Sequence, residues 1–316
     1  MTASGDPQVR APNPPDRRRA AQQGTGERSS GIVNCDHEKN ATANSNQAPG
    51  FQMAGGGPAR LRSTDGCSFG VRARIMIPIL RIIGDVHAQI DHADLFTCNA
   101  RPYLDIIADA GFSVQLGDMG DRGTYEQLVA SVDAGRHRFF PGNHEHCDWL
   151  PPHNLGDFGN VLLGGVEFFF ARGAWSSDRE KLIQLGREED KTIWFKQEEL
   201  TDEQMSAALE EYLPLRPRIV LSHDAPTHVA RYAWQNARRF SAPNSRAVFS
   251  ASRTTDFLER LLEHHQPRLW LYGHHHRDWR RQEGKTLFVC VGELSYVDID
   301  SNGNVHGQRG DPGLPI

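Results

Sequence analysis

Five short stretches of the sequence carry side chains of the kinds that bind metals. They are Asp85 with His87, Asp118 with Asp121, Asn143 with His144, His223, and His274 with His276. Each stretch directly follows an apolar run that is typical of a buried strand. In an open α/β sheet the carboxyl ends of the strands lie at one edge, where ligands bind. We therefore expect the five clusters to converge on one site.

Each cluster taken alone also has an ordinary structural explanation. An Asp after a Gly is common in turns, and a single histidine at a strand end, such as His223, is more often a packed side chain than a ligand. The stretch "GHHH" (273–276) could be a surface tract with incidental metal affinity. Such explanations would have to hold five times and would not explain why the ligands follow the strands. We therefore favour a shared site.

The residue types indicate which metals this site would bind. Carboxylates, imidazoles and one amide oxygen, without a thiolate, suit Mn, Fe or Zn better than a structural Cys-rich zinc site. Seven candidate ligands are too many for one ion. Two divalent ions bridged by a carboxylate form the arrangement that clamps the attacking and leaving oxygens in phosphoryl displacement. Asp118 is the expected bridge because it is central in chain order.

Apolar runs alternate with helical patterns through the middle of the chain. Strands are expected at 77–83, 112–116, 136–140, 218–222, 268–272, 286–291 and 296–300, and as a hairpin at 160–171 around Gly164 and Gly165. Helices are expected at 102–110, 124–134, 201–213 and 255–265, the third opened by a capping box of Thr201 and Gln204. This order indicates one layered α/β domain of about 225 residues.

The two ends of the chain differ from this domain. Residues 1–74 are rich in Pro, Gly, Ser, Asn, Gln and Arg without apolar periodicity, which predicts a disordered low-complexity N-terminal tail. We expect the domain at residues 75–300 and a flexible C-terminal tail at 301–316. Met76 immediately precedes the first strand, and we hypothesise that it is the natural start of translation. Mass-spectrometric detection of peptides from residues 1–60 would reject that hypothesis.

Charge and cysteine content bound the setting and the partners. Residues 1–74 hold 10 of the 35 Lys and Arg and 6 of the 40 Asp and Glu, which leaves an acidic body with 25 against 34. An acidic body lacks a broad basic surface, so we do not expect a nucleic acid as main partner. The five cysteines have no Cys-x-x-Cys spacing, which indicates a reducing cytoplasm. No run approaches the roughly 18 apolar residues of a membrane span, so we expect a soluble protein with no membrane partner.

Together the motifs resemble the calcineurin-like metallophosphoesterase superfamily, over about residues 75–300. They are "GDVH" (84–87), "GDMGDRG" (117–123), "GNHE" (142–145), "SHDAP" (222–226) and "GHHH" (273–276), in the order of that family. The resemblance implies an α/β fold, a four-layer sandwich of two mixed β-sheets flanked by helices. It also implies that one metal is bound by Asp85, His87, Asp118 and His276, and the other by Asp118, Asn143, His223 and His274.

The resemblance further implies catalytic roles. His144 would protonate the leaving oxygen, Asp121 would orient His144, and Arg122 would hold the substrate phosphate. A histidine can donate a proton near pH 7, and a carboxylate partner stabilises its charged form. The planar fork of an arginine matches phosphate oxygens. Without its flanking motif, Arg122 would as readily form a surface salt bridge.

The implied activity is hydrolysis of phosphate monoesters, with a Ser/Thr protein phosphatase among the candidates, by two divalent ions and a metal-bridging hydroxide as nucleophile. Mn²⁺ is favoured, with Fe or Zn as alternatives. The "DRG" element resembles protein phosphatases and diadenosine-tetraphosphate hydrolases, and the "GHxH" pair resembles phosphodiesterases. The substrate is therefore left open as a phosphorylated small molecule, a nucleotide or a phosphoprotein, with a diesterase as alternative. A non-catalytic scaffold is disfavoured because the ligand set is complete. The sequence indicates no oligomeric state.

Two further stretches, "GAWSSDREK" (173–181) and "TIWFKQEEL" (192–200), resemble segments of a small set of phage and bacterial metallophosphoesterases. Trp175, Asp178 and Arg179 follow a strand and could reach the site. Trp194 and Phe195 could cap it, although packing is favoured over substrate contact for these two aromatic residues.

Overall fold

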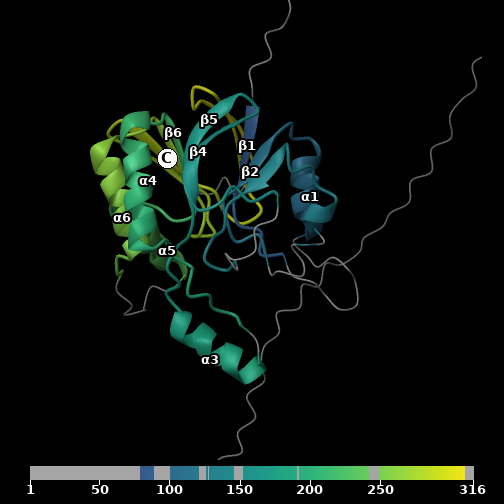
Figure 1. Ribbon diagram of the computed structural model, residues 1–316, viewed down its shortest axis with the longest axis vertical. Coiled ribbons are helices and arrows are strands. Elements are labelled where there is room, and N and C mark those ends of the chain that lie inside the picture. Colours follow the sequence, from purple (N-terminus) through teal and green to yellow (C-terminus); the bar gives the residue numbers. More distant parts are fainter. Residues whose placement is uncertain are drawn as a thin grey trace, which may run out of the picture. The chain divides into compact units, whose positions relative to one another are not determined.

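The computed structural model describes residues 79–88, 100–120, 126, 128–145, 152–190, 192–241 and 249–309 (Figure 1). All of these belong to the second of two compact units, Val71–Ile316. Residues 1–74, Met76, Asp121 and Arg122 lie outside the described residues, so the predictions made for them stay predictions. None of the described helices is long and apolar enough to cross a membrane.

The first sheet has five strands in the order β11-β10-β1-β2-β3. β1, β2 and β3 are parallel, whereas β10 runs antiparallel to β1 and β11 antiparallel to β10. The sheet is therefore mixed, and its parallel strands all end at one edge. The strands are β1 (Ile79–Ile83), β2 (Ser113–Gln115), β3 (His137–Phe139), β10 (Tyr296–Asp300) and β11 (Val305–Arg309).

The second sheet has six strands in the order β4-β5-β6-β7-β9-β8. Its four central strands are parallel and its two edge strands, β4 and β8, are antiparallel to their neighbours. The strands are β4 (Phe158–Leu163), β5 (Val166–Ala171), β6 (Ile219–Ser222), β7 (Leu269–Tyr272), β8 (Trp279–Glu283) and β9 (Thr286–Cys290).

Helices cover the outer faces of the two sheets (Figure 1). Residues of α1 pack on the outer side of the first sheet, and residues of α4, α5 and α6 on that of the second. α3 lies in the connection between β5 and β6. The helices are α1 (Ala100–Ala108), α3 (Arg179–Glu189), α4 (Asp202–Leu215), α5 (Thr227–Ser241) and α6 (Arg253–His264).

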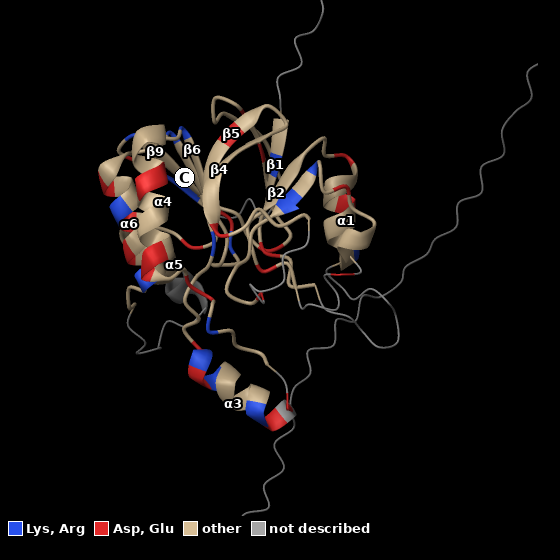
Figure 2. Cartoon of the chain, viewed as in Figure 1, with Lys and Arg blue, Asp and Glu red and all other residues tan. Residues whose placement is uncertain are grey.

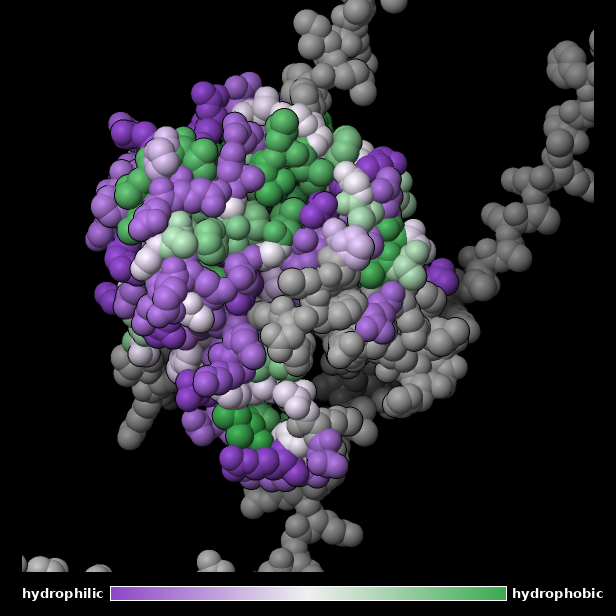
Figure 3. All heavy atoms as spheres, in the orientation of Figure 1, coloured by the Kyte–Doolittle hydropathy of each residue, from purple (hydrophilic) through white to green (hydrophobic). Residues whose placement is uncertain are grey.

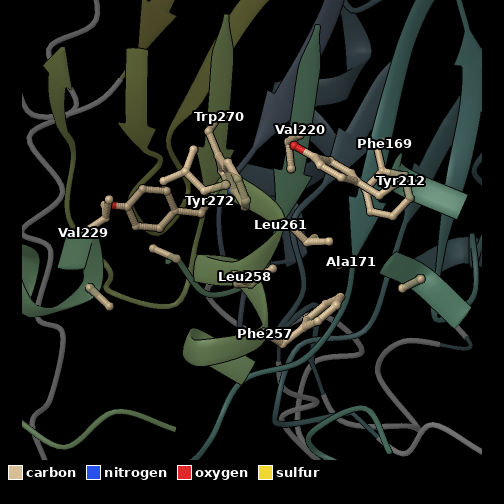
Figure 4. Close-up of a cluster of buried hydrophobic side chains, with 14 of the residues drawn as sticks. Phe169, Ala171, Tyr212, Val220, Val229, Phe257, Leu258, Leu261, Trp270 and Tyr272 are labelled. Carbon is tan, nitrogen blue, oxygen red and sulfur yellow. The ribbon is translucent and has the colours of Figure 1, made fainter. Parts of the chain in front are cut away.

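The core shows why the central strands are apolar throughout. Phe168 and Phe170 of β5 lie between the two sheets, whereas Phe169 and Ala171 face the helices on the other side. Figure 4 shows Phe169 beside Tyr212 of α4. Successive side chains of a strand point to opposite faces, and both faces of this strand are buried. The layers are thus helices, sheet, sheet and helices, which confirms the predicted four-layer sandwich.

Locally encoded features agree with the prediction. The hairpin at 160–171 turns at Gly164 and Gly165, and Thr201 and Gln204 form a capping box at the start of α4. α6 begins two residues earlier than predicted because Ser252 caps it together with Thr255.

The structure differs from the predictions in other places. The helix predicted at 124–134 ends at residue 130 within the part of the chain that is described, and α3, α5, β8 and β11 were not predicted. β8 and β11 are mostly polar edge strands in which Trp279 and Val305 are the apolar residues that pack against the core, so they carry only a weak apolar signal. Residues 305–309 pair with β10, so this part of the predicted C-terminal tail is a strand. Polar edges of this kind protect a sheet from pairing with other chains. The edge strand β4 differs, because its Leu162 is 71% exposed. Figure 3 shows hydrophobic residues on the surface in the region where Figure 1 labels β4 and β5.

Candidate metal centre

The five predicted clusters follow β1, β2, β3, β6 and β7, three strands of one sheet and two of the other. Hydrogen bonds join the loops across the sheets. Nδ1 of His223, after β6, donates to the carbonyl oxygen of Leu116, after β2, at 2.8 Å. The N–H of Gly173, after β5, donates to the carbonyl oxygen of Pro141, after β3, at 3.1 Å. The carboxyl edges of both sheets therefore meet. Figure 2 shows acidic positions among the loops beneath the labelled strands.

The structure brings six of the seven predicted ligands together in two groups. One ligand atom from each member of a group lies within 4.8 Å of the others. The first group is Asp85, His87, Asp118 and His276, and the second is Asp118, His223 and His274. Oδ1 of Asn143 lies beside the second group, 2.9 Å from Nε2 of His223. Asp118 belongs to both groups, at the position predicted for a bridge.

In both Asp85 and Asp118 one carboxylate oxygen accepts a backbone hydrogen bond, and the other oxygen faces the histidines. Oδ1 of Asp118 accepts a 3.0 Å hydrogen bond from the backbone N–H of His144. The Oδ2 atoms of Asp85 and Asp118 are buried and accept no hydrogen bond from the described residues. Nε2 of His276 is 3.1 Å from Oδ2 of Asp85, and Nε2 of His223 is 3.3 Å from Oδ2 of Asp118. Buried oxygens without a donor, facing imidazole nitrogens, fit a divalent cation.

A carbonyl oxygen sets the orientation of the His223 ring. Because Nδ1 of His223 donates to Leu116, Nε2 is the nitrogen that faces Asp118 and Asn143. Metal-binding histidines commonly make this kind of outer hydrogen bond, which fixes the ring and its tautomer. Nε2 is therefore the nitrogen through which His223 would bind a metal.

The backbone at the site adopts an uncommon conformation. φ is 48° at His87, 57° at Asp118, 64° at His274 and 51° at His276, in the left-handed region that side chains with a Cβ avoid. Each such residue costs about 1–3 kcal/mol, which the surrounding structure must offset. Gly142 allows a close approach, because a Cβ added there would overlap Oδ1 of Asp118. The loops are thus built around the ligand positions at the expense of local backbone energy.

Charges within the site shift several pKa values. Burial alone would raise the pKa of Asp118, but the charges of His223, His144 and His87 hold it well below its ordinary value. Burial alone would lower the pKa of His223, yet the adjacent Asp118 raises it to about 10. Burial lowers the pKa of His274 to about 4. His274 is therefore neutral at pH 7, whereas a cation bound at Nε2 of His223 must displace a proton.

Glu145 is a site residue to which the sequence analysis assigned no role. Its buried carboxylate accepts hydrogen bonds from the backbone N–H groups of Asp118 at 3.0 Å, of Gly142 at 2.6 Å and of Met119. It thereby ties the loop after β2 to the loop after β3. Its place in "GNHE" was the only sequence signal for it.

Two further acidic residues face histidines of the last motif. Oδ1 of Asp224 is 3.3 Å from Nε2 of His275, which joins the loops after β6 and β7. Oε2 of Glu293 is 3.8 Å from Nδ1 of His276. No spacing in the sequence indicated either pair, because each partner lies on a different loop.

The predicted catalytic residues divide into one that is described and two that are not. The His144 side chain is 37% exposed, and its Nε2 is 4.0 Å from Oδ2 of Asp118. Its ring centroid is 5.6 Å from that of His87, so this partly exposed side chain borders the first group. Asp121 and Arg122 lie outside the described residues. Trp194, for which packing was favoured over capping, is half-buried, and its ring centroid lies 5.3 Å from the guanidinium carbon of Arg179.

Comparisons with known proteins identify the family. A family model described as calcineurin-like phosphoesterase matches residues 80–278. No curated protein matches the chain. Among solved structures, a Thermotoga maritima protein is 15% identical, with 74% of this chain and 99% of that chain covered and a TM-score of 0.35.

Two other similar structures are enzymes. The phosphopantetheinyl hydrolase of Mycobacterium tuberculosis is 13% identical, covering 69% of this chain and 90% of that one, with a TM-score of 0.36. An archaeal phosphodiesterase is 14% identical, covering 73% and 98%, with a TM-score of 0.33. Likeness at this level carries no argument about substrate.

Proposed function

Because the chain belongs to the calcineurin-like phosphoesterase family and is a hydrolase of phosphate esters, we propose that it cleaves phosphate monoesters with two divalent metal ions. One observation carries the proposal: two groups of candidate ligands meet at Asp118. A carboxylate shared between two groups is what a bridged pair of ions requires.

The proposed ligands of one ion are Asp85, His87, Asp118 and His276. Those of the other are Asp118, Asn143, His223 and His274. Support comes from the buried Oδ2 atoms of Asp85 and Asp118, which have no donor among the described residues. Oxygen and imidazole ligands without a thiolate favour Mn²⁺, with Fe or Zn as competitors set by availability.

When bound, the two ions would supply positive charge for the phosphoryl oxygens and the ionisation of a water molecule at neutral pH. The protein itself would supply and position the general acid, the group that protonates the leaving oxygen. His144 is half-exposed beside His87, and its backbone N–H is anchored on Asp118. We propose that its imidazole donates the proton to the leaving oxygen. From the motif, Asp121 would orient His144 and Arg122 would bind the phosphate through its planar fork.

A phosphodiesterase or nucleotide hydrolase, including one for diadenosine-tetraphosphate-like substrates, is the second candidate. It is favoured by the pair His274 and His276 in a "GHxH" motif, whereas the monoesterase is favoured by "DRG" at 121–123. Both use the same metal centre and differ in how the second ester group is accommodated.

Hydrolysis of p-nitrophenyl phosphate and bis-p-nitrophenyl phosphate should be measured side by side, with Mn²⁺ and with EDTA. We expect Mn²⁺-dependent turnover that prefers the monoester and is lost in EDTA. Preference for the diester would select the second candidate. Turnover that EDTA leaves unchanged would contradict a metal-dependent mechanism.

A further inference from the structure

The side chain of Asn143 is held by the connection between β5 and β6, and we propose that Ser176 and Glu198 are positioning residues that orient Asn143 for metal binding. The inference rests on the proposed function, because it takes Asn143 to be a ligand. It gives Ser176 and Glu198, in the segment 173–200, a role that was not predicted from the sequence.

A chain of hydrogen bonds links the three residues. Nδ2 of Asn143 donates to Oγ of Ser176 at 2.9 Å, and Oγ of Ser176 donates to Oε2 of Glu198 at 2.6 Å. The three residues are each 2% exposed. Water is therefore a poor substitute for any partner in the chain, and loss of one hydrogen bond leaves a buried polar group unpaired.

The direction of these hydrogen bonds decides which end of the amide faces the metal. A serine hydroxyl has one hydrogen, and here it points to Glu198, so Oγ presents lone pairs to Asn143. Only the Nδ2 end of the amide can bind such an acceptor. A flipped amide would place Oδ1 against Oγ, two acceptors in contact without a hydrogen between them. Ser176 and Glu198 therefore turn Oδ1 toward His223, where it lies 2.9 Å from Nε2.

Glu198 is itself fixed by the segment. The backbone N–H of Ser176 donates to Oε2 of Glu198 at 3.3 Å, and the N–H of Ala174 donates to the Glu198 carbonyl at 3.2 Å. Arg172 is buried and donates to the carbonyl oxygen of Gln197 at 2.8 Å and to the carboxylate of Asp157. Hydrogen bonds thus hold the start of the segment, just after β5, against its end at 197–198.

The segment also contacts the loop after β3, which carries Asn143. The N–H of Gly173 donates to the carbonyl oxygen of Pro141, two residues before Asn143. The residue that reaches the site is therefore Ser176, between the Trp175 and Asp178 that the sequence analysis singled out. Asp178 is exposed and its side chain makes no capping hydrogen bond at the start of α3.

The test is calorimetric titration of the full chain with Mn²⁺ after EDTA treatment and dialysis. Wild type, Ser176→Ala and Ser177→Ala would be compared, Ser177 being the exposed neighbour and the matched control. We expect Ser176→Ala to weaken one of two Mn²⁺ sites about 10-fold or more, as loss of outer hydrogen bonds does in metal sites. The other site and both sites of Ser177→Ala should stay within about twofold of wild type.

A double-mutant cycle separates positioning from a general structural role. In an Asn143→Ala background, Ser176→Ala should change Mn²⁺ affinity no further, because Ser176 acts only through Asn143. If Ser176→Ala does not fold, Glu198→Gln keeps the packed volume, removes the charge and should still weaken the same site. Unchanged Mn²⁺ affinities in Ser176→Ala or Glu198→Gln would overturn the inference alone. Absence of Mn²⁺ binding by wild type would instead overturn the proposed function.

Discussion

The backbone N–H of His274 donates a 3.0 Å hydrogen bond to Oδ1 of Asp85, which links the loop after β7 to the loop after β1. The N–H of His144 binds Oδ1 of Asp118 in the same way. In both pairs one oxygen of the carboxylate anchors a neighbouring loop, and the other is turned toward the histidines. The same carboxylates therefore join the loops and present candidate ligand atoms.

Asp118→Asn should reduce Mn²⁺-dependent hydrolysis at least about 100-fold, because it removes the charge shared by both ligand groups while keeping the shape. Bound Mn²⁺ per chain, measured by elemental analysis, should fall in parallel. Asp105→Asn on the exposed side of α1 is the control and should match wild type. Retained activity in Asp118→Asn would reject its role as the shared ligand.

Gly142→Ala should lower the free energy of unfolding by about 1–3 kcal/mol, because the added Cβ would overlap Oδ1 and approach the backbone nitrogen of Asp118. Mn²⁺ binding should weaken as well, since Asp118 must move. Gly111→Ala is the control, as no atom lies within 4 Å of its added Cβ. Urea denaturation checks the first effect, and equal stability of the two variants would contradict this account of the close approach.

Glu145→Ala should destabilise the protein by about 1–3 kcal/mol for each buried N–H that loses its acceptor, among them the N–H groups of Asp118 and Gly142. The loops after β2 and β3 should then separate and weaken metal binding. Glu210→Ala, at an exposed position of α4, serves as control. A Glu145→Ala variant as stable as this control would show that water satisfies those N–H groups.

The free energy of unfolding should fall at acid pH, in part because the Asp300 carboxylate becomes protonated. Burial alone would raise the pKa of this carboxyl, but hydrogen bonds from His306, Asn304 and Asn302 hold it well below its ordinary value. A lowered folded-state pKa contributes stability above the unfolded pKa of about 4, and that contribution is lost as pH falls through the folded pKa.

Asp300→Asn should therefore cost about 1–3 kcal/mol at pH 7, and less as the pH drops below about 4. Urea denaturation of wild type and variant between pH 7 and pH 2.5 measures the difference. A difference that stays constant across this range would mean that the Asp300 charge adds no stability. His306→Ala should reproduce part of the effect, because His306 donates to Oδ2 of Asp300 at 2.9 Å.

Much of the fold could be predicted because its signals are local. β6 and β7 are buried on both faces, so they appear as apolar runs, and the capping box of Thr201 and Gln204 lies within one turn. β8 and β11 escaped prediction because they are strands only through pairing with β9 and β10. Their own residues are mostly polar and carry only a weak strand pattern.

The same distinction between local and long-range signals applies to the candidate site. The sequence by itself determined which side chains can bind a metal and that each follows a strand, because residue type and hydrophobic period are local properties. Asp118 was already expected as the shared ligand, and the proximity of the two ligand groups, which only the folded chain produces, agrees with that expectation. Only the tertiary structure decided that the ends of two different sheets meet and that Glu145 and Ser176 contact the candidate ligand residues. These contacts join residues 26 or more positions apart, for which no short-range pattern exists.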